Sequence, residues 1–207
     1  MPRITRSTAT ATLVALSSVI GTAAFAEQGS WLVRAGASVV DPRSDNLNLG
    51  PGTTLQIDEA TRPTFNVTYM FRDNWGVELL ASTVWSHDLL VRSPTGTTRL
   101  GEVNVLPPTV SLQYHFNPSG RFRPYAGVGL NYAFLFDEEP AALSVENSFG
   151  PAAQLGLDIG LNDRWFLNLS ARYIDLDGGA RLGATDLGAV AVDPFVYGIH
   201  VGYRFGR

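Results

Sequence analysis

A long alternation of apolar and polar residues between positions 106 and 136 constrains the fold of this chain most strongly. A turn at 117–120 divides it into two segments. Every second residue is apolar in both: Val110, Leu112, Tyr114 and Phe116 in the first, and Ala126, Val128, Leu130, Tyr132, Phe134 and Phe136 in the second. A period of two predicts β-strands with one apolar and one polar face. Strands of about ten residues exceed the roughly 5–6 usual in soluble sandwiches, and they fit a barrel wall that crosses an outer membrane.

Residues 1–26 have the pattern of a secretory signal peptide. A positively charged start precedes an apolar run of small residues over 11–25, and Ala24-Phe25-Ala26 places small residues where a signal peptidase cleaves. A membrane anchor helix is the alternative, but the run is short and is interrupted by Ser and Thr. We therefore expect export, followed by an outer-membrane barrel domain over residues 27–207. No later run approaches the roughly 18 apolar residues of a membrane helix, so a membrane-spanning form must be a barrel.

The chain after the signal peptide contains eight alternating segments. They lie at 31–41, 64–71, 75–85, 109–116, 122–136, 149–161, from 165 and from 195. Their connections alternate between short turns near Asp73, Pro118 and Asp163 and long polar loops at about 42–62, 87–102, 137–147 and 176–193. Short periplasmic turns and long extracellular loops are typical of outer-membrane barrels. The sequence therefore predicts an all-β fold: an eight-stranded antiparallel transmembrane β-barrel with both termini on the periplasmic side.

Large aromatic residues gather at the segment ends beside the short turns. They are Trp31, Phe71, Trp75, Tyr114, Phe116, Trp165, Tyr203 and Phe205. Amphipathic rings at this level are typical of the boundary between membrane and water. A secreted soluble barrel with its apolar face inward would show the same alternation. Its exterior would then consist of many glycines and few charges, and its narrow interior would have to hold too many large rings.

The composition narrows the possible functions. A net charge of −4 argues against a nucleic-acid surface, and the lack of Cys excludes thiolate chemistry. Ser86-His87-Asp88 contains the three residue types of a hydrolytic triad, but neighbours in a strand point to opposite faces, so we interpret His87 as a hydrogen-bonding loop residue. His115 and His200 could bind a metal only with a third ligand. We expect no enzymatic activity, no cofactor and no metal site.

The polar face of the segments predicts the barrel interior, which eight strands leave just wide enough for side chains. Toward the short turns it predicts a polar plug of Arg34, Glu78, Gln113, Arg123, Asp158, Arg172 and His200. Buried charges must be paired, so Arg34 and Glu78 are expected to be neighbours. Toward the long loops the inward positions become apolar, and they predict a pocket of Val40, Val84, Leu135, Ile174 and Val196, with Trp85 facing outward. Packing beneath the loops is the alternative role for these residues.

Prolines interrupt the predicted wall. Pro107 and Pro108 lie within it, and Pro151 lies in the outer part of the sixth segment. Proline donates no ladder hydrogen bond and is found in sheets at edges or bulges. We therefore expect a wall that opens sideways at these residues, unless the prolines only end strands near the loops. A hydrophobic solute could enter from outside, meet the plug and leave into the bilayer.

The sequence resembles the OmpW family of small bacterial outer-membrane barrels over nearly all of the chain after residue 26. Matching stretches include Trp31-Leu32-Val33-Arg34-Ala35-Gly36, Asn74-Trp75-Gly76-Val77-Glu78, Leu106-Pro107-Pro108-Thr109, Arg123-Pro124-Tyr125-Ala126-Gly127 and Gln154-Leu155-Gly156-Leu157-Asp158. The resemblance implies an eight-stranded barrel in the bacterial outer membrane and passage of small hydrophobic compounds. One difference is that such barrels commonly end on an aromatic residue, whereas Gly206 and Arg207 follow Phe205 here.

Three hypotheses for the function remain. The first is a transport barrel, whose partners would be outer-membrane lipid, lipopolysaccharide and small hydrophobic solutes. The second is a structural or adhesive barrel that acts through its long loops, where the acidic run at 137–139 could bind divalent ions near lipopolysaccharide. The third is a lipid-modifying enzyme, which would need Ser, His and an acid together at the outer rim.

Overall fold

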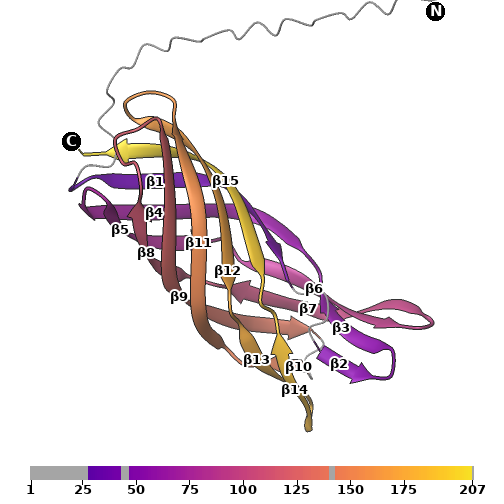
Figure 1. The fold of residues 1–207 in the computed structure, drawn as a ribbon. Helices are drawn as coiled ribbons and strands as arrows, with labels where there is room; N and C mark the ends of the chain where they lie inside the picture. The colour runs from indigo at the N-terminus through magenta and orange to yellow at the C-terminus, as the bar shows by residue number, and fades with distance from the viewer. Residues whose placement is uncertain (1–27, 43–46, 140–142, 207) are drawn as a thin grey trace, which may run out of the picture.

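The computed structural model describes residues 28–42, 47–139 and 143–206, and these form an all-β fold (Figure 1). The predicted signal peptide lies outside the described residues. Within the described ranges no helix is long and apolar enough to span a membrane. The strands are β1 (Trp31–Asp41), β2 (Leu47–Gly50), β3 (Thr53–Ile57), β4 (Ala60–Arg72), β5 (Trp75–Ser82), β6 (Trp85–Ser93), β7 (Gly96–Leu106), β8 (Thr109–His115), β9 (Phe122–Glu139), β10 (Leu143–Val145), β11 (Ser148–Gly160), β12 (Trp165–Ile174), β13 (Asp177–Leu182), β14 (Thr185–Ala191) and β15 (Phe195–Phe205).

In the described part of the chain, eight strands close into one antiparallel barrel. They follow one another around the wall in the order β1, β4, β5, β8, β9, β11, β12 and β15. The first and last strands pair along their full length, from Trp31 opposite Phe205 to Asp41 opposite Phe195. Because each strand has a partner on both sides, the closed wall avoids exposed sheet edges. The predicted eight-stranded antiparallel barrel is confirmed.

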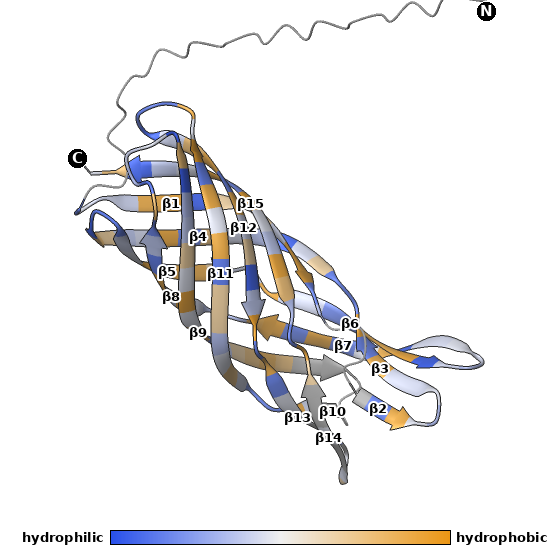
Figure 2. Cartoon of the chain, viewed as in Figure 1, coloured by the Kyte–Doolittle hydropathy of each residue, from blue (hydrophilic) through white to orange (hydrophobic). Residues whose placement is uncertain are grey.

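The alternation in the sequence separates an apolar exterior from a polar interior. Val128, Leu155 and Ile199 point outward and are 60–66% exposed. Arg34 and Glu78 point inward and are fully buried. Figure 2 shows hydrophobic and hydrophilic residues alternating along the strands. This arrangement suits a wall surrounded by lipid, because the backbone is satisfied within the closed sheet and the side chains that meet hydrocarbon are apolar.

The short turns lie at the end of the barrel where β1 begins and β15 ends (Figure 1). Aromatic pairs surround this end, with ring centroids 4.7 Å apart for Trp31 and Tyr69, 5.0 Å for Trp75 and Tyr114, and 4.9 Å for Trp165 and Tyr203. Paired rings at this level match the aromatic ring of a membrane boundary. Since short turns face the periplasm in outer-membrane barrels, this is the periplasmic end.

The long extracellular connections contain further strands, which were not expected from the sequence. The sheet continues from the extracellular end of β9 through β7, β6, β3 and β2. A separate three-stranded sheet contains β10, β13 and β14. The buried side chains of Leu55, Leu89 and Val103 pack together on the inner face of the extended wall. The outward face of β6 carries Asp88 and Arg92, which hydrocarbon would not accommodate. These strands therefore project beyond the bilayer.

Val84 and Trp85 have the opposite orientations to those predicted: Val84 is 39% exposed, whereas Trp85 is 2% exposed and faces the interior. The β5–β8 ladder ends with Leu80 opposite Thr109, and the β6–β7 ladder begins with Trp85 opposite Val105. Between these two residue pairs, the connection from β5 to β6 contains one residue more (81–84) than the connection from β7 to β8 (106–108). An extra residue reverses the face of every side chain that follows, which explains why the prediction fails here.

Candidate functional site

The barrel interior is divided into layers along its axis. At the periplasmic end, Leu32, Met70 and Phe166 form a small buried apolar cluster, which was not predicted. A layer of buried charged and polar side chains lies above it, and a larger apolar cluster lies at the extracellular end. Strand β15 shows the change along its inward face, which runs from His200 to Val196. The interior is therefore polar in the middle and apolar toward the outside of the cell.

Arg34 is the centre of the polar layer, which we call the plug. Its guanidinium donates two hydrogen bonds to Asp158, from Nε to Oδ1 at 3.3 Å and from Nη2 to Oδ2 at 2.9 Å. Nη1 donates to Thr68 Oγ1 at 2.7 Å and to Glu78 Oε2 at 3.5 Å. The expected proximity of Arg34 and Glu78 is present, but Asp158 is the closer partner because it meets the guanidinium in the bidentate geometry that makes such pairs strong.

Glu78 connects Arg34 to a second arginine. Its Oε1 accepts a hydrogen bond of 2.6 Å from Arg172 Nη2, and Arg172 also donates to Gln154 Oε1. The side chains of Arg172 and Glu78 are 6% and 0% exposed. A carboxylate this deeply buried requires such partners to remain charged. Asp158, Arg34, Glu78 and Arg172 thus form one chain of buried ion pairs across the lumen.

Neutral side chains join this chain to the opposite wall. Asn168 Nδ2 donates to Asp158 Oδ1 at 2.8 Å and to the Tyr125 hydroxyl at 3.0 Å. His200 lies 2.8 Å from Thr64 Oγ1 through Nε2 and 3.3 Å from Asn168 Oδ1 through Nδ1. The plug therefore combines charged and neutral members into one hydrogen-bonded network, which adds rigidity when its members are satisfied.

The remaining predicted plug residues lie on β8 and β9. Gln113 Oε1 is 3.2 Å from His115 Nε2, and both side chains are fully buried. The Arg123 guanidinium lies 5.3 Å from the ring centre of Phe166, in cation–π geometry, so it covers the apolar cluster at the periplasmic end. Within residues 28–42, 47–139 and 143–206, no three His, Cys, Asp or Glu side chains are grouped in a way that could hold a metal ion.

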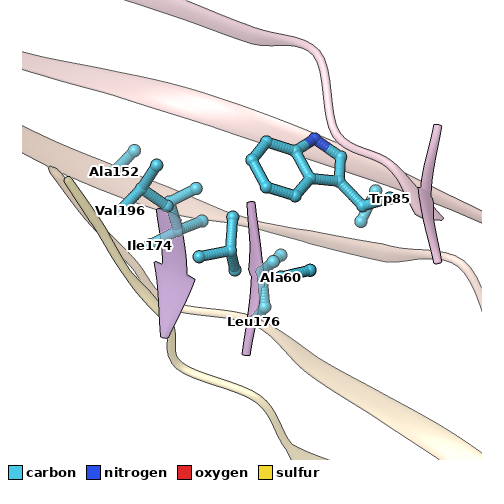
Figure 3. Close-up of a cluster of buried hydrophobic side chains, with 8 residues drawn as sticks. Ala60, Trp85, Ala152, Ile174, Leu176 and Val196 are labelled. Atoms are coloured by element: carbon cyan, nitrogen blue, oxygen red, sulfur yellow. The ribbon is translucent and has the colours of Figure 1, made fainter. Parts of the chain in front are cut away.

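An apolar cavity of about 90 Å³ lies on the extracellular side of the plug. Figure 3 shows the buried cluster that contributes much of its lining, including Trp85, Ile174, Leu176 and Val196. The volume is of the same order as the roughly 150 Å³ apolar cavity that admits benzene. Of the predicted pocket residues, Val40, Leu135, Ile174 and Val196 line this cavity. Val84 does not, because the extra residue before Trp85 turns it to the outside.

His87 brings a polar ring into the cavity lining. It lies on β6, beyond the bilayer, and its Nδ1 is 2.9 Å from the backbone carbonyl oxygen of Asp58. Its ring is parallel to that of Trp85, with an interplanar angle of 10° and a centroid distance of 6.4 Å. Burial of the ring lowers the pKa of His87 from its usual value, so the ring is neutral at pH 7.

A seam in the wall borders the cavity. The strands that end there are β5 at Ser82 and β7 at Leu106, and those that begin there are β6 at Trp85 and β8 at Thr109. Pro107 and Pro108 occupy the interval between β7 and β8, and Pro107 also lines the cavity. The seam therefore coincides with the extra residue described above, and it lies between β5–β6 on one side and β7–β8 on the other.

The opposite edge of the proline segment remains attached to β9. Tyr132 N donates to the carbonyl oxygen of Pro108 at 3.1 Å. Asn131 Nδ2 donates to Thr109 Oγ1 at 2.7 Å, and it lies 3.1 and 3.3 Å from the carbonyl oxygens of Pro107 and Pro108. Pro108 therefore faces β9, and neither proline can donate a backbone hydrogen bond in the interval between β7 and β8.

Pro151 does not belong to this seam. It lies in β11 opposite Leu130, within a β9–β11 ladder that continues past it to Ser148. Much of the cavity wall was not predicted, because Leu55 and Leu89 lie in segments that were expected to be loops, and Val103 lies between such a loop and the fourth predicted segment. The alternation of apolar residues from Trp85 onward was the signal that could have identified β6.

The fold and the interior define a class of protein: a small β-barrel of the bacterial outer membrane, with an apolar belt, a polar plug and an apolar extracellular cavity. The chain belongs to the OmpW family, whose family model matches residues 27–205. It is therefore an outer-membrane protein and not an enzyme. The match begins where the predicted signal peptide ends.

Individual proteins support this assignment. The chain is 35% identical to Outer membrane protein W of Escherichia coli (strain K12), over 95% of this chain and 98% of the relative. It is 27% identical to the Dibenzothiophene metabolism operon protein PahQ of Pseudomonas aeruginosa, over 87% of this chain and 91% of the relative. The crystal structure of OprG from Pseudomonas aeruginosa matches with a TM-score of 0.76 at 34% identity, covering 87% of this chain and 98% of OprG.

Proposed function

We propose that the protein carries small hydrophobic solutes across the outer membrane by a lateral route. A solute enters the apolar cavity from the extracellular side and is stopped by the plug. It then leaves through the seam beside Pro107 and enters the bilayer. The observation that carries this proposal is that one cavity borders both a plug below it and an interrupted ladder at its side.

The chemistry of the cavity favours apolar solutes. Burial of apolar surface contributes roughly 25 cal/mol per Å², whereas a polar solute would lose its hydrogen bonds to water in an apolar lining. The ion-pair chain from Asp158 to Arg172 occupies the lumen below, so a direct axial passage would require breaking it. The name of PahQ agrees with this solute class, since dibenzothiophene is an apolar aromatic compound.

The route is tested by restoring backbone donors at the seam. In the variant Pro107→Thr/Pro108→Thr, the β5–β8 and β6–β7 ladders should join, so uptake of a hydrophobic fluorescent probe by cells should fall. Pro108→Thr alone is the matched control, because its backbone faces β9, where Tyr132 already holds the strand. Its uptake should stay near that of the unaltered protein. Gel mobility of unheated samples and surface labelling verify that both variants fold and reach the outer membrane.

Two outcomes contradict the proposal in different ways. Normal uptake by a correctly folded double variant would exclude the lateral exit. Equal uptake by cells with and without the protein would exclude transport of that solute class altogether, and the extracellular hairpins would then become the functional part. A hydrophilic probe, measured in the same cells, controls for general damage to the outer membrane.

A further inference from the structure

His87 offers the cavity a hydrogen-bond acceptor. Its Nδ1 contacts the carbonyl oxygen of Asp58, and a carbonyl oxygen can only accept. The proton of the neutral ring must therefore lie on Nδ1, which leaves the lone pair on Nε2. Within the described part of the chain, Nε2 has no protein hydrogen-bond partner. His87 is buried and lines the cavity.

Two other polar side chains, those of Glu146 and Ser148, belong to the lining. Ser148 Oγ donates its proton to the carbonyl oxygen of Asp177 at 2.6 Å. Glu146 is exposed to solvent. The remaining side chains of the lining are apolar or aromatic, such as Leu55 and Val103. Among the described lining residues, the buried side-chain acceptors are therefore His87 Nε2 and the lone pairs of Ser148 Oγ, and both are surrounded by an extensive apolar surface.

We infer that the cavity selects neutral solutes that carry one hydroxyl or N–H donor on an apolar body, such as small phenols and alcohols, and that His87 recognises this donor. This inference rests on the proposed function, because it names the solute class of the same cavity. A pure hydrocarbon would bury Nε2 without a partner. An ether or ketone would place its own lone pair against that of Nε2. A net hydrogen bond of ordinary strength corresponds to about 2- to 12-fold in affinity.

The test compares three probes of similar size: phenol, which donates, anisole, which only accepts, and toluene, which does neither. The mature protein in detergent micelles is titrated with each probe, and binding is followed by the NMR signals of the methyl groups in the lining. His87→Phe keeps an aromatic ring but removes the acceptor. Val103→Ala is the matched control, because Val103 lies directly opposite His87 in the β6–β7 ladder and lines the same cavity. Partition of a probe into micelles is the same for every variant. It therefore cancels when the ratio of the affinities for two probes is compared between variants.

We expect the preference for phenol over toluene to fall about 2- to 12-fold in His87→Phe and to persist in Val103→Ala. Anisole should behave like toluene. In the unaltered protein, the ¹⁵N signal of His87 Nε2 should shift with phenol alone, and this measurement requires no variant. If all probes bind and the phenol preference is the same in His87→Phe, the role of His87 is refuted while the proposed function stands. If no probe binds the unaltered protein, the cavity is not a solute site and both proposals fail.

Discussion

The substitution Glu78→Ala tests whether the buried ion-pair chain stabilises the barrel. Glu78 accepts a hydrogen bond of 2.6 Å from Arg172 and lies 3.5 Å from Arg34. After the substitution, Arg34 keeps Asp158 and Thr68, whereas Arg172 keeps its bond to Gln154 but loses its carboxylate. The main cost is therefore a buried guanidinium without a counter-charge. Removing one partner of a buried pair costs about 3–5 kcal/mol.

An exposed ion pair of the same length provides the control. Asp88 Oδ1 lies 2.6 Å from Arg99 Nε, but the two side chains are 45% and 50% exposed. Exposed pairs contribute about 0.2–1 kcal/mol, because water screens the charges. Since the two distances are equal, a larger effect of Glu78→Ala than of Asp88→Ala can be attributed to burial.

Urea unfolding in detergent micelles, followed by tryptophan fluorescence, measures both variants. With a slope of about 2 kcal/mol per M, Glu78→Ala should lower the unfolding midpoint by about 1.5–2.5 M and Asp88→Ala by less than about 0.5 M. Similar midpoints for the two variants would refute the reasoning. Adding Arg172→Met to Glu78→Ala should recover part of the loss, because it removes the charge that was left without a partner.

Three further predictions concern the interior. Gly202→Ala should destabilise the barrel by about 1–3 kcal/mol in the same assay, because a Cβ there would lie 2.2 Å from the ring of Phe166. Arg34→Ala should speed the leakage of small polar solutes from liposomes that contain the protein, and unchanged leakage would argue against the plug. Toluene affinity should be constant above about pH 6.5 and should fall as the pH drops through the lowered pKa of His87, because burial favours the neutral ring and protonation adds a charge to the cavity. In the variant His87→Phe, toluene affinity should not change between about pH 8 and 5, a range that includes the ordinary histidine pKa. A pH dependence in that variant would show that another group causes the effect.

The sequence by itself determined the barrel and the polarity of its interior. A period of two is a local property of each strand, so it predicts which residues face lipid without knowledge of any neighbouring strand. The inward phase of Arg34, Glu78 and Asp158 followed from the same rule. Because several charged side chains point into the lumen, they were expected to form pairs, since an isolated buried charge is costly.

Only the tertiary structure decided which groups meet. Asp158 is the closest carboxylate to Arg34 although 124 residues separate them, because β1 and β11 contribute to the same layer of the lumen. The extra residue before Trp85 is visible only as a difference between two paired ladders, and it turns Val84 outward and Trp85 inward. The cavity likewise depends on β3, β6 and β7, which extend the wall beyond the bilayer and supply part of the lining. These features arise from the registers between strands, and a register is a relation between distant segments that the alternation within one segment does not contain.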